Sequence, residues 1–153
     1  HNRCRRQRQM CIRDRVMHSA QAMYDLVNDV SNYPTFMEGC YGVEVFEHTD
    51  LTMLARLDLK KAGVSLSLMT RNHLKAPSAI KMTLEDGPFK TFRGDWVFTA
   101  LTEKACKVEL DMEFDFSSRS LSFAASNLFA GVANNLVDSL CLRADKVYGK
   151  NSA

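Results

Sequence analysis

The chain has 153 residues, of which 46% are hydrophobic and 25% charged, and its formal net charge is +2. This length and composition are typical of a single globular domain. The sequence contains no run of the roughly 20 apolar residues that a membrane-spanning helix needs, so we expect no transmembrane segment.

The positive charge is concentrated at the start of the chain. Residues 1–15 contain six of the 20 basic and one of the 18 acidic residues, so the remainder carries 14 basic and 17 acidic side chains. Because this remainder is not basic, its bulk charge gives little support for nucleic-acid binding. The segment also lacks the apolar stretch of a secretory signal.

Three interpretations of this basic head stay open: a disordered arm, an arginine-rich targeting remnant, or sequence foreign to the domain. The chain begins with His1 rather than Met, which favours the third. We therefore assign residues 1–15 to a doubtful head, 16–149 to the domain and 150–153 to a tail.

The five cysteines show no pairing pattern. Cys4, Cys11, Cys40, Cys106 and Cys141 include no CxxC pair and no nearby histidine partner. Neither a disulfide framework nor a metal site is indicated. Free thiols that pack as small apolar side chains fit a reducing compartment, so we expect a cytoplasmic protein.

Helical periodicity opens the domain, after a strand expected near residues 10–17. Ser19 is a good N-cap, and apolar residues then recur at helical spacing, which predicts a helix over residues 20–29. The next segment contains the helix-breaking Pro34 and ends in Gly39 and Cys40. It predicts a short helical turn followed by an exit at Gly39.

From residue 41 to residue 117 the apolar side chains recur at every second position in place of helical spacing. Between residues 105 and 116, apolar and charged side chains alternate, which predicts a strand with one dry and one wet face. Similar alternation indicates strands within residues 41–48, 51–60, 64–74, 79–84 and 89–98. The connections are too short for parallel crossovers, so the strands form an antiparallel meander.

A long amphipathic helix ends the domain. From about residue 118 the apolar positions again follow helical spacing, until Gly149 stops the pattern. The expected apolar stripe consists of Leu121, Ala125, Leu128, Phe129, Val132, Leu136, Leu140, Ala144 and Val147. At about 45 Å such a helix crosses a whole sheet. The sequence therefore predicts an α+β fold, with a curved antiparallel sheet of six to seven strands wrapped on this helix.

One helix fills the concave side of such a sheet incompletely, so we expect an apolar cavity beneath it. The inward positions that would line it are Phe36, Val43, Met53, Leu57, Leu66, Leu68, Met82, Phe92, Trp96, Phe98, Met112, Phe114, Leu128, Val132 and Leu136. The same residue types also form ordinary cores, and methionine adapts to both settings.

No arrangement of residues indicates catalysis. His1, His18, His48 and His73 have no expected inward partner, and the acids of residues 105–116 fall on the wet face. Catalysis would need a nucleophile with a base, paired carboxylates or a metal cluster aimed into the cavity. We therefore expect a non-enzymatic binding protein without a metal.

Four segments along the domain are distinctive: SAQAMYDLVNDVSNYPTFMEGC at 19–40, KAGVSLSLMTRN at 61–72, DGPFKTFRGDW at 86–96, and the strand and helix of 106–148. They resemble the polyketide cyclase/START-like superfamily and, within it, the RatA and coenzyme Q-binding protein family. The resemblance covers about residues 16–149 and implies the helix-grip fold, with two short helices after the first strand.

The resemblance implies two functions. The first is binding of ubiquinone or a related lipid in the cavity, which would support respiration, with Tyr33, Pro34, Asp86, Gly87, Pro88 and Phe89 at the cavity mouth. The second is a toxin of a toxin–antitoxin pair that binds the large ribosomal subunit and blocks subunit association. Its basic patch would comprise Lys60, Lys61, Arg71, Lys75, Lys90 and Arg93. A bacterial cytoplasmic location, with contact to the inner membrane surface, fits both.

Overall fold

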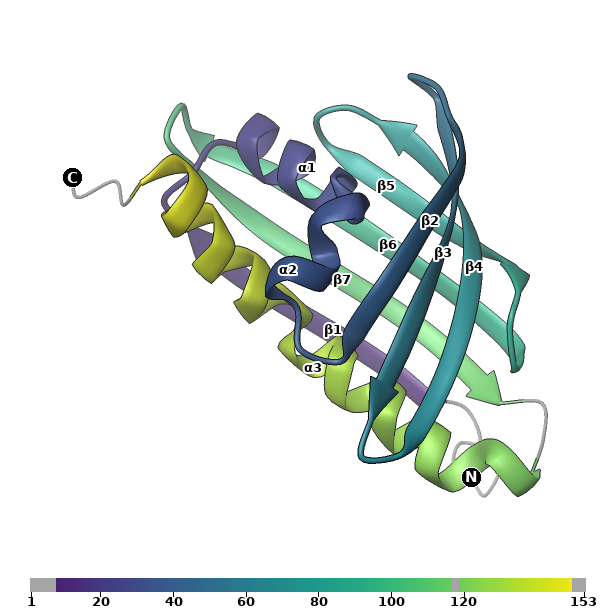
Figure 1. Ribbon diagram of the computed structural model, residues 1–153. Coiled ribbons are helices and arrows are strands. Elements are labelled where there is room, and N and C mark those ends of the chain that lie inside the picture. Colours follow the sequence, from purple (N-terminus) through teal and green to yellow (C-terminus); the bar gives the residue numbers. More distant parts are fainter. Residues whose placement is uncertain (1–7, 117–118, 150–153) are drawn as a thin grey trace.

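The computed structural model describes residues 8–116 and 119–149, and its helices all lie on the concave side of a curved sheet (Figure 1). The seven strands are β1 (Arg8–Val16), β2 (Cys40–His48), β3 (Thr52–Lys61), β4 (Val64–Lys75), β5 (Ala79–Asp86), β6 (Phe89–Thr102) and β7 (Ala105–Phe116). The helical elements are α1 (Ala20–Asn28), the 3-10 turn η2 (Val30–Asn32), α2 (Tyr33–Phe36) and α3 (Arg119–Tyr148).

All seven strands belong to one antiparallel sheet in the order β1-β7-β6-β5-β4-β3-β2. Strands β2 to β7 form the expected meander, and β1 pairs with β7 at the far edge. Bulges in β2 and β6 interrupt the register, and such bulges increase the local bend of a strand. The expected α+β architecture is confirmed.

Strand β7 shows why alternation produces this sheet. Cys106, Val108, Leu110, Met112 and Phe114 point inward and are at most 3% exposed. The charged residues between them lie on the outer face, where Lys107 pairs with Glu109. One face is therefore held by apolar burial and the other by water and ion pairs.

The sheet begins earlier in the chain than the sequence pattern indicates. Strand β1 starts at Arg8 and pairs with β7 along its whole length, from Arg8 opposite Phe114 to Val16 opposite Cys106. Much of the segment assigned to the basic head is therefore an edge strand of the domain. Residues 1–7 lie outside the described part of the chain.

Helix α1 begins and ends as its sequence indicates. The Ser19 hydroxyl accepts a hydrogen bond from the backbone N–H of Ala22 at 3.0 Å, and the helix ends at Asn28. After η2 and α2, Gly39 adopts a φ of +93°, and a Cβ there would lie 2.8 Å from the Val132 side chain. Glycine is required at this turn both for its backbone angle and for the close approach to α3.

Helix α3 packs against the sheet and α1. Its buried side chains are Ala125, Leu128, Phe129, Ala133, Val137, Leu140 and Ala144. Ala133 and Val137 were missing from the expected stripe. Val147 was wrongly included and is 50% exposed, because the neighbouring Tyr148 turns toward α1 and donates a hydrogen bond to the Ala22 carbonyl. The side chain of Leu121 lies outside the described residues.

A buried histidine ties the end of α3 to the start of α1. The His18 side chain is 3% exposed, and its Nε2 lies 2.8 Å from Asp145 Oδ1. The expectation that His18 has no inward partner was wrong, because its partner comes from the last turns of α3 and not from a neighbouring strand. Among the described residues, no helix combines the length and apolar content needed to cross a bilayer.

Replacement of Asp145 by alanine should destabilise the fold. It leaves the buried His18 nitrogen without its partner, which costs about 1–3 kcal/mol. Urea unfolding, followed by the fluorescence of the single tryptophan, measures this loss. The control is Asp138→Ala on the exposed side of the same helix, which should change stability by less than about 0.5 kcal/mol. Equal losses in the two variants would show that the His18–Asp145 contact contributes nothing.

Candidate functional site: an apolar cavity beneath the C-terminal helix

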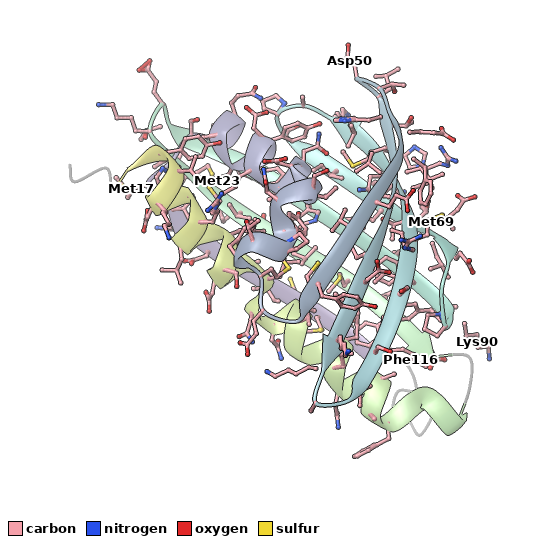
Figure 2. All side chains as sticks on the ribbon, in the orientation of Figure 1. Met17, Met23, Asp50, Met69, Lys90 and Phe116 are labelled. Atoms are coloured by element: carbon pink, nitrogen blue, oxygen red, sulfur yellow. The ribbon has the colours of Figure 1, made fainter. Side chains whose placement is uncertain are left out.

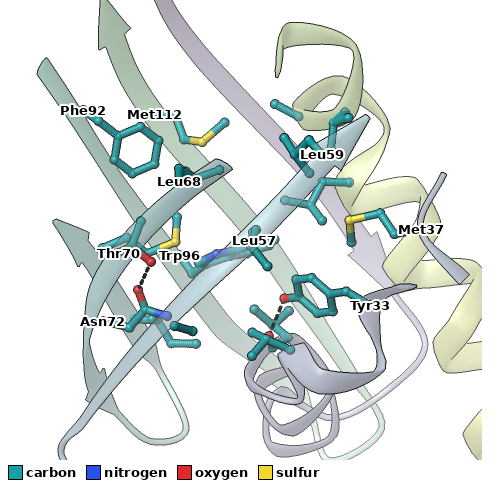
Figure 3. A pocket seen from close by; sticks show the side chains of 18 of the residues that line it. Tyr33, Met37, Leu57, Leu59, Leu68, Thr70, Asn72, Phe92, Trp96 and Met112 are labelled. Carbon is teal, nitrogen blue, oxygen red and sulfur yellow. Dashed lines mark hydrogen bonds between the residues drawn. The ribbon is translucent and has the colours of Figure 1, made fainter. Parts of the chain in front are cut away.

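A cavity of about 80 Å³ lies between the inner face of the sheet and the helices (Figure 3). Its walls come from α1, η2, α2, α3 and strands β3 to β7. The lining residues are Val27, Asn28, Val30, Tyr33, Met37, Ala55, Leu57, Leu59, Leu68, Thr70, Asn72, Ile80, Met82, Phe92, Trp96, Met112, Phe129, Val132, Ala133 and Leu136. Most of these side chains are apolar, as expected for a space under an amphipathic helix.

The structure brings together many of the residues that the sequence places in the cavity. Those that line it are Leu57, Leu68, Met82, Phe92, Trp96, Met112, Val132 and Leu136. They share the inward positions of the strands or the sheet-facing side of α3. The structure therefore gathers these eight side chains around one cavity.

Other expected lining residues lie elsewhere. Leu66 and Leu128 are buried core residues, Val43 is partly buried against the core, and Met53 lines a separate surface recess. Phe98 stacks on Trp96 and packs against Tyr24 of α1. Phe36 lies on α2, with the Arg143 guanidinium carbon 5.3 Å from its ring centroid. Inward parity alone does not show which core positions border an empty space.

The residues expected at the mouth are divided between two regions. Tyr33 lines the cavity, whereas Pro34 beside it does not. Asp86 ends β5, and Gly87 and Pro88 lead into β6; none of the three lines the cavity, although a Cβ on Gly87 would lie 3.4 Å from Leu68, which does. Phe89 is buried in an aromatic cluster with Phe92, Phe114, Phe116 and Phe129, in which the centroids of Phe89 and Phe116 are 4.6 Å apart. This cluster lies in the interior next to the turn, and its members Phe92 and Phe129 also line the cavity.

Tyr33 is held rigidly in the cavity wall. Its side chain is 4% exposed, and its hydroxyl donates a hydrogen bond to the Val27 carbonyl near the end of α1. Burial, with smaller contributions from Cys40 and Asp29, raises the pKa of this phenol well above its usual range. The hydroxyl therefore stays protonated and connects α2 to α1.

Two buried polar residues interrupt the apolar wall. Thr70 and Asn72 occupy inward positions of β4 and are each 7% exposed, and the Thr70 hydroxyl donates to Asn72 Oδ1 at 2.8 Å. In Figure 3 the Asn72 amide nitrogen lies on the side away from Thr70. Asn28 of α1 adds a third polar group to the lining. None of the three was among the predicted lining residues, although Thr70 and Asn72 break the apolar alternation at the inward positions of β4.

Methionines occupy part of the interior space. A Cβ on Gly94 of β6 would lie 2.5 Å from the terminal methyl of Met82 and 3.3 Å from Cγ of Met112. The absence of a side chain at Gly94 therefore leaves room that two flexible side chains fill. Because methionine adopts many rotamers, this part of the wall adapts its shape at low cost.

The described residues show no reactive centre in or near the cavity. Burial raises the pKa of Cys106 to about 11 and that of Cys141 to about 12, so both thiols are protonated at neutral pH. No cluster of three His, Cys, Asp or Glu side chains suited to a metal ion occurs in the same residues.

The six basic residues of the expected patch do not form one surface. Arg71 pairs with Glu47 and Glu85, and Arg93 pairs with Asp95, Asp111 and Glu113. Lys75 lies at the end of β4 that bonds to the β2–β3 turn, where the N–H of Leu74 donates to the Leu51 carbonyl. Lys60, Lys61 and Lys90 lie at the opposite end of the sheet, and Figure 2 shows Lys90 far from Asp50 of the β2–β3 turn.

Comparison with known proteins identifies the family. The family model described as polyketide cyclase / dehydrase and lipid transport matches residues 16–141. The chain belongs to this family. It is 47% identical over 135 residues to a Vibrio cholerae protein named ribosome association toxin RatA, covering 88% of this chain and 94% of the relative. A protein of the same name from Escherichia coli K12 is 42% identical over 133 residues, which cover 87% of this chain and 84% of the relative.

Solved structures establish the fold within the family. An aromatase/cyclase from a Streptomyces species superposes with a TM-score of 0.79 at 16% identity, covering 95% of this chain and 99% of that protein. A START superfamily protein from Mycobacterium smegmatis gives a TM-score of 0.75 at 17% identity, covering 91% of this chain and 98% of that protein. The expected helix-grip fold is confirmed, and identities this low carry the fold alone.

Removal of one member of the Thr70–Asn72 hydrogen bond should lower the stability of the protein, whereas removal of both members should lower it little. Thr70→Val leaves Asn72 Oδ1 without its donor and should destabilise the protein by about 1–3 kcal/mol. Adding Asn72→Leu should restore most of this loss, because both polar groups are then gone. Urea unfolding of the single and double variants measures the difference, with the exposed Thr99→Val as control. Additive losses in the double variant would contradict the assigned hydrogen bond.

Proposed function

We propose that this protein associates with the ribosome as a toxin and acts by binding rather than by catalysis. The observation that carries the proposal is the similarity to proteins named ribosome association toxin RatA, at 42–47% identity over 84–94% of their length. Similarity of this extent covers the fold and most of the surface, and not only a motif. The large ribosomal subunit and an antitoxin are the partners that this proposal implies.

The chemistry of the described residues supports binding. The two thiols with strongly raised pKa values are poor nucleophiles at neutral pH, and the cavity wall carries no carboxylate, lysine or histidine. Acid–base catalysis requires such a group within hydrogen-bond reach of a substrate.

The distribution of cations suggests where ribosomal RNA would contact the protein. Arg71 and Arg93 are neutralised by their acidic neighbours, whereas Lys60 and Lys90 form no ion pair within the described residues. Lys61 lies 3.6 Å from the highly exposed Glu38, a weak surface pair. We therefore place the RNA contact at the sheet end that carries Lys60, Lys61 and Lys90.

Charge reversal at this end should abolish ribosome binding. In co-sedimentation with purified large subunits, the unaltered protein should bind at low salt and dissociate steeply as salt rises. The triple variant Lys60→Glu, Lys61→Glu, Lys90→Glu should bind at least tenfold more weakly, because three phosphate contacts are lost. The control reverses Lys75, Lys81 and Lys104 near the other end and should bind normally. The proposal fails if the unaltered protein does not co-sediment, and the location fails if the two triple variants bind equally.

We further propose that the cavity holds an apolar ligand, such as a quinone or related neutral lipid. The observation in favour is an apolar space beneath α3 whose wall also presents buried polar groups, the usual composition of a small-molecule site. Burial of an isoprenoid tail would contribute about 25 cal/mol per Å² of apolar area. At about 80 Å³ the cavity is smaller than typical ligand sites of roughly 300–1,000 Å³, so the ligand must displace side chains on entry.

Extraction of the purified protein tests ligand binding. Organic solvent should release a neutral lipid in stoichiometric amount, detected by mass spectrometry. Val132→Trp places an indole in the cavity and should remove the lipid, whereas Asn135→Trp on the exposed side of α3 should retain it. An empty extract from the unaltered protein, with no uptake of added ubiquinone, would refute this second proposal.

A further inference from the structure

Two hollows meet at the junction of α1 and η2. The apolar cavity lies inside, and a recess of about 280 Å³ lies on its outer side. The recess is lined by Asp25, Asn28, Asp29, Val30, Ser31, Val45, His48 and Met53. Asn28 and Val30 line both spaces. The junction is therefore a thin wall between the apolar interior and a polar recess at the surface.

A hydrogen-bond acceptor in this wall has no donor. Asn28 Oδ1 is buried and has no hydrogen-bond partner among the described residues. A buried acceptor without a donor destabilises a protein, so its presence is evidence for a missing partner. Because Asn28 lines the cavity, a donor on a molecule inside the cavity would supply this bond.

Asn72 supplies the complementary group. Its oxygen already accepts the hydrogen bond from Thr70, and its amide nitrogen lies on the other side (Figure 3). An amide nitrogen donates two hydrogen bonds, so Asn72 keeps donor capacity inside an otherwise apolar wall. The cavity thus presents an acceptor from α1 and a donor from β4.

The charges around these groups exclude an anion. No Lys, Arg, His, Asp or Glu lines the cavity, so a charged group would be buried without a counter-charge. The recess outside carries the carboxylates of Asp25 and Asp29, with His48 as its single basic side chain. A carboxylate or phosphate would therefore lose its hydration without gaining a counter-charge inside the cavity, and the aspartates of the recess would repel it outside.

We propose that the cavity takes an uncharged amphiphile with a hydroxyl or N–H group, which bonds to Asn28 and Asn72 while its apolar part lies beneath α3. The inference rests on the proposed ligand binding and narrows it to molecules that carry a donor, such as the hydroxyl group of a lipid or quinol, which the oxidised quinone lacks. We place ligand entry at the α1–η2 junction, because Asn28 and Val30 line both hollows. Met82 and Met112, which meet over Gly94, move aside to accommodate it.

Three ring probes of similar size test the preference: benzene, phenol and benzoate. With the methionine methyl groups labelled with ¹³C, the signals of Met37, Met82 and Met112 report cavity binding, and Met69 on the outer face serves as an internal control. Phenol should shift the cavity methyls and bind about tenfold more tightly than benzene, the value of one hydrogen bond. Benzoate should shift none of them.

The variant Asn28→Leu keeps the side-chain size and removes the acceptor. It should lose most of the preference for phenol over benzene, and its melting temperature should equal or exceed that of the unaltered protein, because no orphaned acceptor remains. Asn134→Leu on the exposed side of α3 is the matched control and should keep the phenol preference.

The results distinguish an error in the polar site from a failure of the proposed ligand binding itself. If benzene binds and phenol binds no better, or if benzoate binds, the cavity takes apolar molecules but the polar site is wrong. If Asn28→Leu folds and keeps the phenol preference, Asn28 is not the acceptor. If none of the probes shifts the cavity methyls, the proposed ligand binding itself fails.

Discussion

The packing of α3 against a concave sheet is the constraint on which the rest of the structure depends. The helix is fixed near its C-terminus by His18 and Asp145, and at the other end of the interior the aromatic cluster around Phe89 and Phe129 fills the space. Between these two anchors, the helix and a curved sheet of seven strands cannot match their surfaces everywhere. The cavity is the space that this mismatch leaves, and α1, η2 and α2 enclose it.

Polar groups make this interior unlike an ordinary core. Thr70 and Asn72 satisfy each other through one hydrogen bond, whereas the buried Asn28 Oδ1 has no partner among the described residues and lowers stability. Departures of this kind concentrate at functional sites, where local stability is lost in favour of binding. The lysines proposed to contact RNA lie on the outer surface, so the proposed ribosome contact and the proposed ligand site are separate parts of the molecule.

Local periodicity predicted most of the fold, because alternation and helical spacing are recorded directly in the sequence. The predicted strand boundaries were wrong where backbone pairing, and not side-chain burial, holds a strand in the sheet. Strand β6 continues to Thr102 although Thr99, Ala100 and Leu101 are exposed, since pairing with β7 holds its backbone. Strand β1 is polar and is likewise held by pairing. In the cavity, alternation and helical spacing identified Met82, Trp96 and Leu136. They did not identify Asn28 and Asn72, because only the packing of helix on sheet shows that these polar side chains border the same space.

A crystal structure determined under xenon pressure would show whether the space beneath α3 is empty, because xenon enters dry apolar spaces inside proteins. We expect a xenon atom beneath α3, in contact with Met82, Met112 and Leu136, with the surrounding backbone unchanged. A crystal in which these side chains fill the interior, with no xenon between the helix and the sheet, would contradict it.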